Sequence, residues 1–357
     1  MIYVTRWLLV ALLTSPWYFS SLSIASEGTL RISVVPPGLY EIASGSNEWN
    51  IYLDGVIEPG AEKRVERELS RISDSVIQVH LNSPGGDFLT GIRLGRLFRE
   101  KSAWTNISRQ GSSAMPNPGE CYSACAMAYL GGYYRFVTKG SKYGVHRAWK
   151  NSASTESDLD MGQIISAAAS AYIREMGADG GLLDLIVSAG KNELYFLNEA
   201  EQKKLRVTNG GRAPAEWSLQ LSQGLYYLRG VQDTMYGQGK FLLYCTKQGL
   251  AVHSIYEAGS AKSSSIANGE WFHSLLIDSR TVPLGKPSRI KDNHGFLNAS
   301  FLLSPQQIKK ISLARESIGH AMQVTREAPT FVGYRVDLNA DTSNKLRDFI
   351  STCPSKN

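Results

Sequence analysis

The chain has 357 residues, a length that fits two domains better than one. Its hydrophobic content of 43% and charged content of 20% are typical of a globular protein with a core, and they exclude a disordered or fibrous chain. The net charge of +6 is modest, and the Lys and Arg residues are scattered, so we expect no nucleic-acid partner.

Residues 1–26 have the order of a secretory signal peptide. Arg6 precedes the apolar residues 7–13, and the small residues of 20–26 supply a cleavage site. An uncleaved membrane anchor is the alternative, but the apolar run is short for a span and Pro16 lies directly beyond it. We therefore predict an exported protein, either periplasmic or secreted.

Strand-like and helix-like patterns alternate through the next part of the chain. The expected strands cover 51–57, 76–81 and 105–107, with a strand end at 195–198; the expected helices cover 61–72, 92–98, 124–130, 164–176, 182–188 and a charged segment ending at 205. Strands that alternate with helices indicate βαβ units and a largely parallel sheet, so the expected fold class is α/β. Residues 110–120 are rich in Gly and Pro and are expected to form a loop.

The pattern of apolar residues changes after the Gly- and Pro-containing segment 209–214. Short strand-like segments then dominate, at 241–244, 250–255, 270–277, 295–303 and 330–336, with helices at 305–314 and 343–350. They predict a smaller C-terminal domain that is α+β or mostly β. The predicted division is a signal peptide at 1–26, a catalytic domain at 27–208, a linker at 209–224 and an accessory domain at 225–357.

The four cysteines take their meaning from the predicted export. In an oxidising compartment, Cys245 and Cys353 are candidates for a disulfide that ties the end of the chain to an earlier strand. Cys121 and Cys125 could pair with each other or remain buried thiols. No second closely spaced pair of cysteines is present and the histidines are dispersed, so we expect no zinc site.

Three elements supply the parts that acyl transfer requires. Gly85 and Gly86 come after a predicted strand and leave backbone N–H groups clear to meet an oxyanion. Ser123 lies in a small-residue turn before a predicted helix, and a solitary histidine, His146, lies downstream. A serine hydroxyl is unreactive unless a base removes its proton, so Ser123 and His146 have meaning only as a pair.

These motifs resemble those of the proteolytic subunit of the Clp protease. The resemblance rests on Asn82-Ser-Pro-Gly-Gly86, the turn at Ser123 and the Gly-x-His element ending at His146, and it covers roughly residues 51–207. It is closest to the exported, Clp-like branch within the crotonase-type superfamily. The resemblance implies a ClpP/crotonase-like fold and a serine peptidase, with Ser123 as nucleophile and His146 as general base.

Further expectations come from the same resemblance. One glycine of the Gly85-Gly86 pair and the N–H of Ala124 would form the oxyanion hole. The substrate would be a peptide or an unfolded protein, the chain would form a homo-oligomer, and no cofactor would be needed. We expect no ATPase partner, because the predicted compartment lacks ATP.

The third member of a catalytic triad is less well defined by the sequence. A gapless match to the family's acid, which precedes a Phe-Leu-Ser element, falls on Leu194, before Phe196-Leu-Asn198. Either Glu193 fills the role after a shift of one residue, or a polar substitute does, or the triad is incomplete. We predict Glu193, because an orienting acid holds the histidine tautomer that catalysis needs.

Three alternatives stay open at this point. The chain could be a catalytically inactive Clp-like scaffold that binds peptides and engages a partner through its C-terminal domain. A crotonase-type enzyme acting on acyl thioesters is less consistent with export, because that chemistry needs an intracellular coenzyme. A Ser–Lys dyad using Lys139 or Lys142 is the third alternative.

Overall fold

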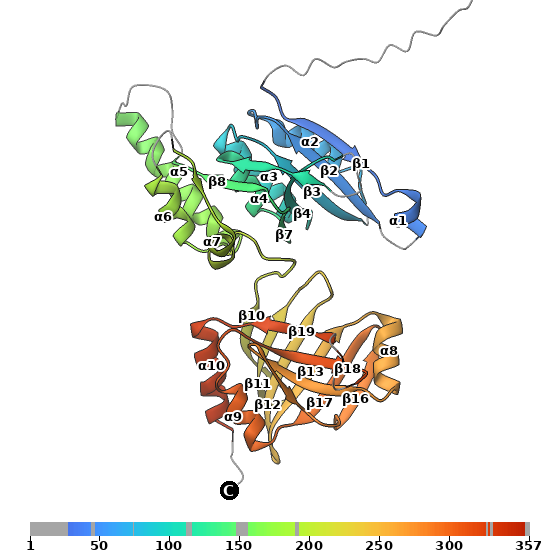
Figure 1. Cartoon of the computed structure of the whole chain (residues 1–357). Helices are drawn as coiled ribbons and strands as arrows, with labels where there is room; N and C mark the ends of the chain where they lie inside the picture. Colours follow the sequence, from blue (N-terminus) through green and yellow to red (C-terminus); the bar gives the residue numbers. More distant parts are fainter. Residues whose placement is uncertain are drawn as a thin grey trace, which may run out of the picture.

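The computed structural model describes residues 28–43, 47–73, 75–111, 116–147, 156–189, 193–325, 328 and 331–353. The predicted signal peptide lies outside the described residues. Buried apolar side chains form one core between Leu30 and Val207 and another between Leu228 and Phe349. Figure 1 shows the two corresponding bodies, one mixed α/β and the other mostly β. The domain boundaries themselves stay a prediction.

The first core is built on a mixed sheet covered by helices. Its strands run in the order β1 (Arg31–Val35), β2 (Glu48–Asp54), β3 (Val76–Asn82), β4 (Trp104–Arg109) and β5 (Asn117–Pro118), and β7 (Arg135–Val137) also pairs with β4. β2, β3, β4 and β7 are parallel, whereas β1 and β5 pair antiparallel with their neighbours. This agrees with the expected parallel α/β sheet, because the inner strands are buried and apolar.

Helices pack against this core. They are α2 (Ala61–Leu69), α3 (Phe88–Glu100) and α4 (Ala124–Leu130), and a short α1 (Leu39–Ala43) precedes β2. α2 and α3 bury one face each, whereas every residue of α4 is buried. Val65 of α2 and Phe98 of α3 are fully buried in the same core as Val79 of β3. Asp87 caps α3 by accepting a hydrogen bond of 2.8 Å from the backbone N–H of Thr90, so the turn after β3 passes directly into a helix.

A second, smaller sheet lies beside the first and carries the remaining elements of this core. β6 (Glu120–Tyr122) pairs parallel with β8 (Lys142–Val145), and β8 pairs antiparallel with β9 (Tyr195–Phe196). Helices α5 (Glu156–Glu175), α6 (Gly181–Ser188) and α7 (Glu199–Lys204) complete it. The predicted loop at 110–120 thus contains β5 and the first residue of β6. Gly and Pro interrupt the apolar alternation by which strands are predicted, so such short strands are missed. Their pairing with β4 and β8 stabilises them.

Two arginines hold the end of α4. Arg99 and Arg135 donate hydrogen bonds to the carbonyl oxygens of Leu130 and Gly132, where α4 ends. Arg135 is only 1% exposed, and burial lowers its pKa to about 10. A helix C-terminus leaves carbonyl groups without partners and carries partial negative charge, so both cations stabilise it.

The second core lies between two antiparallel sheets. One sheet has the order β10 (Glu216–Ser222), β11 (Leu225–Gln232), β12 (Gly239–Thr246), β13 (Gly249–Glu257), β17 (Phe296–Leu302) and β16 (Arg289–Asn293); the other has the order β15 (Arg280–Pro283), β14 (Phe272–Ile277), β18 (Ser317–Gln323) and β19 (Val332–Asp337). The helices are α8 (Ser260–Asn268), α9 (Pro305–Ile311) and α10 (Ala340–Ser351). This agrees with the expected α+β or mostly β class.

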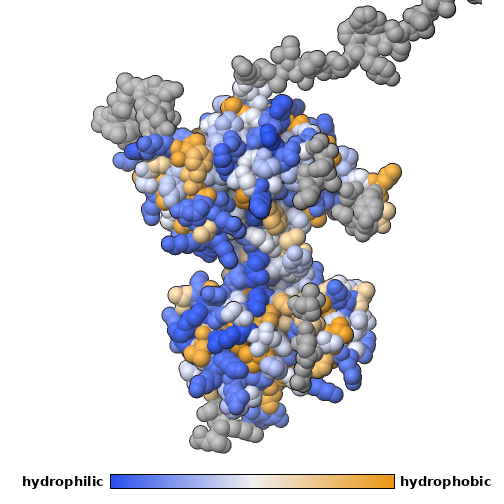
Figure 2. Space-filling view, in the orientation of Figure 1, coloured by the Kyte–Doolittle hydropathy of each residue, from blue (hydrophilic) through white to orange (hydrophobic). Residues whose placement is uncertain are grey.

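Three features of this half differ from the expectation. Four strands, β11, β15, β16 and β18, have no counterpart among the predicted strand-like segments. Residues 216–222, inside the predicted linker 209–224, form the edge strand β10, because its pairing with β11 satisfies a backbone whose side chains stay largely exposed. The sequence pattern also missed α8, a polar helix in which only Ser263 and Ile266 are buried. Figure 2 shows a largely hydrophilic surface on both bodies, with small separate hydrophobic areas.

Disulfides occur in both halves. Cys245 of β12 is joined to Cys353 beyond α10, across 108 residues of sequence, and Cys121 is joined to Cys125. Two disulfides are consistent with an exported protein, because reducing compartments disfavour them. Within the described ranges, no helix combines the length and apolar character needed to cross a membrane.

Candidate active site

Three chain segments meet where parallel strands end. The Ser83 N–H donates to the Glu120 carbonyl at 2.7 Å and the Tyr122 N–H donates to the Ser83 carbonyl at 3.1 Å, so the end of β3 lies beside β6. The Ser123 N–H in turn donates to the Gly144 carbonyl of β8 at 3.0 Å. Since carboxyl ends of adjacent parallel strands meet at one edge, this edge gathers the residues that the sequence singles out.

Ser123 occupies the sharp turn between β6 and α4. Its φ of 57° and ψ of −117° lie outside the conformations that a residue with a side chain ordinarily adopts. Such a backbone costs on the order of 1–3 kcal/mol and persists where the surroundings enforce it. The side chain is half-buried, does not cap α4, and its hydroxyl makes no hydrogen bond with any described residue. A strained strand-to-helix turn that presents a free serine hydroxyl is the geometry of a nucleophile elbow.

Gly85 and Gly86 bring their backbone against this turn. Their φ angles are +104° and +144°. A side chain on Gly85 would put its Cβ 2.7 Å from the Tyr122 carbonyl oxygen and 2.8 Å from the Ser123 Cβ. A Cβ on Gly86 would lie 2.2 Å from the carbonyl oxygen of Ile57. Both positions therefore require glycine, for conformation and for space.

The two glycines differ in whether their N–H groups are free. The Gly85 N–H donates to the Ser83 Oγ at 3.1 Å. The Gly86 N–H has no acceptor among the described residues, and the Ala124 N–H, at the first position of α4, has no acceptor within its helix. A Cβ built on Gly85 would lie 3.2 Å from the Ala124 nitrogen, so the peptide that carries the Gly86 N–H adjoins Ala124. Two free donors thus lie next to Ser123.

His146 comes directly after β8 and is half-buried. Its Nδ1 lies 2.9 Å from the carbonyl oxygen of Arg147. A carbonyl oxygen can only accept, so Nδ1 carries the proton and Nε2 keeps the lone pair that a general base needs. Among the described residues, no hydrogen bond joins the ring of His146 to the Ser123 hydroxyl. The structure brings the backbones of these segments side by side without joining the two side chains.

Glu193 is exposed and lies just before β9. β8 and β9 pair Val145 with Tyr195, and continuing this register by one residue sets Leu194 opposite His146. Residues directly opposite share a face of the sheet, so a continued register would favour Leu194 over Glu193 as the neighbour of His146. No ion pair or hydrogen bond links Glu193 to His146 in the described part of the chain.

Some residues that shape this site have no assigned role in the sequence analysis. The Asn82 Oδ1 accepts the Glu120 N–H at 2.9 Å and so fastens the end of β3 to β6. Ser83 orients the Gly85 peptide through its hydroxyl. Both belong to the Asn-Ser-Pro-Gly-Gly motif, and the polar residues of that motif are the feature of the sequence that could have indicated their roles. Ring packing also matters: Tyr122 and Phe196 contact each other with centroids 5.4 Å apart, and both fill the space left by Gly144.

The Cys121–Cys125 disulfide spans the same turn. Both cysteines are fully buried, one in β6 and the other in the first turn of α4, two residues to either side of Ser123. The bridge therefore closes a five-residue loop whose middle residue is the strained serine, and it limits how far the turn can open.

Comparison with known proteins gives distant structural similarities only. No protein-family model and no curated protein matches the chain. Among solved structures, it is similar to ClpP1 from Listeria monocytogenes, with 17% identity and a TM-score of 0.35 over 45% of this chain and 88% of that one. A point mutant of that ClpP1 gives 17% identity and a TM-score of 0.36 over the same shares, 45% and 88%. A point mutant of the 1510-N membrane-bound stomatin-specific protease gives 16% identity and a TM-score of 0.35 over 44% of this chain and 75% of that one. Similarities this distant assign no activity to the chain.

Proposed function

We propose that this chain is an exported serine peptidase that cleaves peptides or unfolded proteins through an acyl-enzyme. The observation that carries the proposal is the backbone of Ser123, held in a strained turn where its hydroxyl and the adjacent N–H groups of Gly86 and Ala124 have no hydrogen-bond partner among the described residues. Strain at a serine is retained where it serves a function, and free donors beside a nucleophile are suited to an oxyanion. The substrate class rests on the family resemblance.

The residues divide the reaction between them. The Ser123 oxygen attacks the scissile carbonyl carbon while His146 Nε2 takes the hydroxyl proton. The carbonyl oxygen becomes negative and accepts hydrogen bonds from the Gly86 and Ala124 N–H groups. The C–N bond then breaks, and His146 returns its proton to the leaving amine. A water molecule, deprotonated by the same Nε2, hydrolyses the ester and restores the serine.

This mechanism needs a rearrangement of the segment around His146 that brings Nε2 to the Ser123 hydroxyl while Nδ1 keeps the Arg147 carbonyl as its acceptor. Their backbones are already adjacent, through the 3.0 Å hydrogen bond between Ser123 and Gly144. Side-chain rotation about staggered rotamers costs little for a half-exposed histidine, and catalytic hydrogen bonds often form only with substrate bound.

The third member of the catalytic triad is the group that orients His146, and a substitution at Glu193 tests which group that is. In the proposed mechanism the Arg147 carbonyl holds the Nδ1–H of His146, so Glu193→Gln lowers the rate of acylation less than about fivefold. An orienting carboxylate would instead cost several orders of magnitude when neutralised. A loss on that larger scale in Glu193→Gln would assign the role to Glu193, as the sequence analysis predicts, and reject the carbonyl.

A second function is supported by a specific observation. Among the described residues, no ion pair or hydrogen bond joins His146 to a carboxylate or to the Ser123 hydroxyl, which also suits a catalytically inactive Clp-like scaffold that binds peptides. The strained turn and the free N–H groups would then bind a peptide carbonyl without cleaving it.

A fluorophosphonate probe separates the two functions. For a peptidase, the mature wild-type protein is labelled at Ser123, Ser123→Ala is not labelled, and His146→Gln is labelled at least about a hundredfold more slowly. Ser263→Ala, at a buried serine of the second core, is the matched control and retains labelling. No labelling of a folded wild-type protein, while an unfolded peptide still binds, would establish the scaffold and reject the peptidase.

A further inference from the structure

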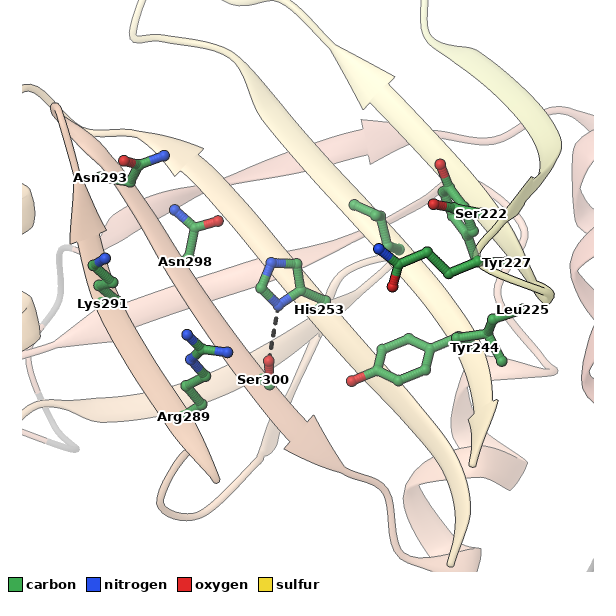
Figure 3. Close-up of a pocket in the computed structure, with 12 residues that line it drawn as sticks. Ser222, Leu225, Tyr227, Tyr244, His253, Arg289, Lys291, Asn293, Asn298 and Ser300 are labelled. Atoms are coloured by element: carbon green, nitrogen blue, oxygen red, sulfur yellow. Dashed lines mark hydrogen bonds between the residues drawn. The ribbon is translucent and has the colours of Figure 1, made fainter. Parts of the chain in front are cut away.

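The six-stranded sheet of the second core has an outward face that is hollowed and polar. The hollow encloses about 650 Å³. Its lining comes from all six strands and the β10–β11 turn: Ser222, Gln223, Leu225, Tyr227, Leu242, Tyr244, His253, Arg289, Lys291, Asn293, Asn298 and Ser300. Figure 3 shows these side chains standing on one face of the sheet. The apolar core lies against the opposite face, so this face has no structural partner among the described residues.

Positive charge lines this face without a compensating carboxylate. Arg289 and Lys291 are exposed on the edge strand β16, and none of the lining residues is acidic. Strand pairing places further basic residues in rows that cross the sheet. One cross-strand row runs from Arg229 through Leu242, His253 and Ser300 to Arg289.

A second row runs from Lys240 through Ile255 and Asn298 to Lys291. In both rows, uncharged residues separate the basic residue of β11 or β12 from the basic residue of β16; beyond them the first row continues to Ser218 of β10 and the second through Val231 to Glu216 of β10. Strands lie about 4.8 Å apart, so the arginine row spans roughly 19 Å. That length suits an extended ligand with several acidic groups.

The centre of the face is held in place and remains uncharged near neutral pH. The His253 Nδ1 lies 2.8 Å from the Ser300 Oγ. Burial lowers the pKa of His253; the Asn298 side chain opposes this shift, and the nearby Arg289 charge adds to it, so that the pKa stays below its usual value. The neutral imidazole, the Asn298 amide and the Ser300 hydroxyl can each donate and accept, as recognition of hydroxyl groups requires.

Tyrosines complete the lining on the other side of the hollow. Tyr227 and Tyr244 are directly opposed on β11 and β12, so their half-exposed rings share this face. The Tyr227 hydroxyl is fixed by a hydrogen bond of 2.6 Å to the Gln220 Oε1. Such rings offer rigid, amphipathic contact area for the apolar side of a ligand.

We propose that this face binds an acidic oligosaccharide, with carboxylates against Arg289 and Lys291 and hydroxyls over the His253–Asn298–Ser300 centre. Guanidinium groups pair with carboxylates in bidentate geometry. A peptide is less well matched, because peptides that add to a sheet pair with the backbone of an edge strand, whereas this ligand would lie across the side chains of all six strands. The inference does not depend on peptidase activity.

Calorimetric titration of the mature protein with tetragalacturonate tests the inference at low salt and pH 7. We expect saturable binding to the wild type, and binding at least about tenfold weaker to Arg289→Gln/Lys291→Gln, from two lost charge contacts. Lys309→Gln/Lys310→Gln removes the same charge from exposed positions on α9 and is expected to bind like the wild type. Thermal unfolding by circular dichroism verifies that both double variants remain folded.

Three results would overturn the inference. Absence of tetragalacturonate binding to the folded wild type is the first. Equal loss of affinity in the two double variants is the second, because it would reduce binding to general charge attraction. The third is binding of a pentaglutamate peptide, or of a neutral oligosaccharide of the same length, as tight as that of tetragalacturonate.

Discussion

A buried chain of hydrogen bonds predicts that the second core loses stability in mild acid. The Tyr334 hydroxyl donates to the Lys240 carbonyl at 2.5 Å and therefore accepts from Ser254 at 2.9 Å. Ser254 then accepts the proton of His320 Nδ1 at 2.8 Å, and His320 Nε2 accepts from His273 Nδ1 at 3.0 Å. Protonating His320 would set two N–H groups against each other, so the network requires a neutral imidazole.

The magnitude follows from the pKa values. Burial lowers the pKa of His273 to about 4 and that of His320 to about 3, where the positive charge of His273 would also disfavour protonation. An unfolded histidine titrates near 6.5. Between pH 6.5 and 5 the unfolded chain binds protons and the folded core does not, so stability falls as the pH falls. Each imidazole contributes about 2 kcal/mol to the difference between pH 7 and pH 5, and the two together about 4 kcal/mol.

Native-state hydrogen exchange measures this loss in β13 and β17 separately from the first core. The expected free energy of opening is at least about 4 kcal/mol lower at pH 5 than at pH 7, after correction for the intrinsic exchange rate, because His253 of β13, whose pKa is also lowered, adds to the two imidazoles. His273→Gln keeps an N–H donor for His320 and removes one titrating group, so its pH dependence is expected to fall by about 2 kcal/mol. His294→Gln, at an exposed histidine, is the control and keeps the full dependence. Equal opening free energies at both pH values, or a His273→Gln variant that matches the wild type, would refute the reasoning.

Further predictions concern the glycine turn and the two disulfides. Gly85→Ala forces a disallowed backbone and a contact of 2.7 Å, so we expect fluorophosphonate labelling to fall at least about a hundredfold, comparable to losing an oxyanion donor; Gly224→Ala, at an open turn, tests whether any glycine loss has this effect. Cys245→Ala/Cys353→Ala opens a loop with a sequence separation of 108 and is expected to lower the free energy of unfolding by about 4–5 kcal/mol, measured in urea. Cys121→Ala/Cys125→Ala opens a loop with a separation of only 4, so we expect about 2 kcal/mol of stability loss but the larger loss of labelling. Reversed rankings of the two double variants in these assays would contradict the assigned roles.

Much of the site's raw material is visible in the sequence. The apolar run into Pro-Gly-Gly predicts a strand followed by a turn that leads into a helix, and β3 and α3 have that form. The paired cysteines and the expected export agree with the two disulfides. These features are local, because the period of apolar residues and the conformational freedom of glycine act over a few neighbouring positions.

Other features depend on contacts between distant segments and had no local signal. Sequence could not choose between Gly85 and Gly86 as a donor, because the choice depends on the Ser83 hydroxyl and on pairing with Ile57. It also could not fix the register of β8 and β9, which pairs Val145 with Tyr195, since a shift of one residue exchanges the two faces of a strand.

The amino-acid sequence by itself determined the alternation of strands and helices, the mostly β second half and which residues are proposed for acyl transfer. Only the tertiary structure decided which strand ends meet, that the Ser123 backbone is strained, and that a basic, polar face remains uncovered on the second core. The physical reason is that strand pairing and packing join residues far apart in the chain, and these long-range contacts decide which groups are buried, bonded or left free.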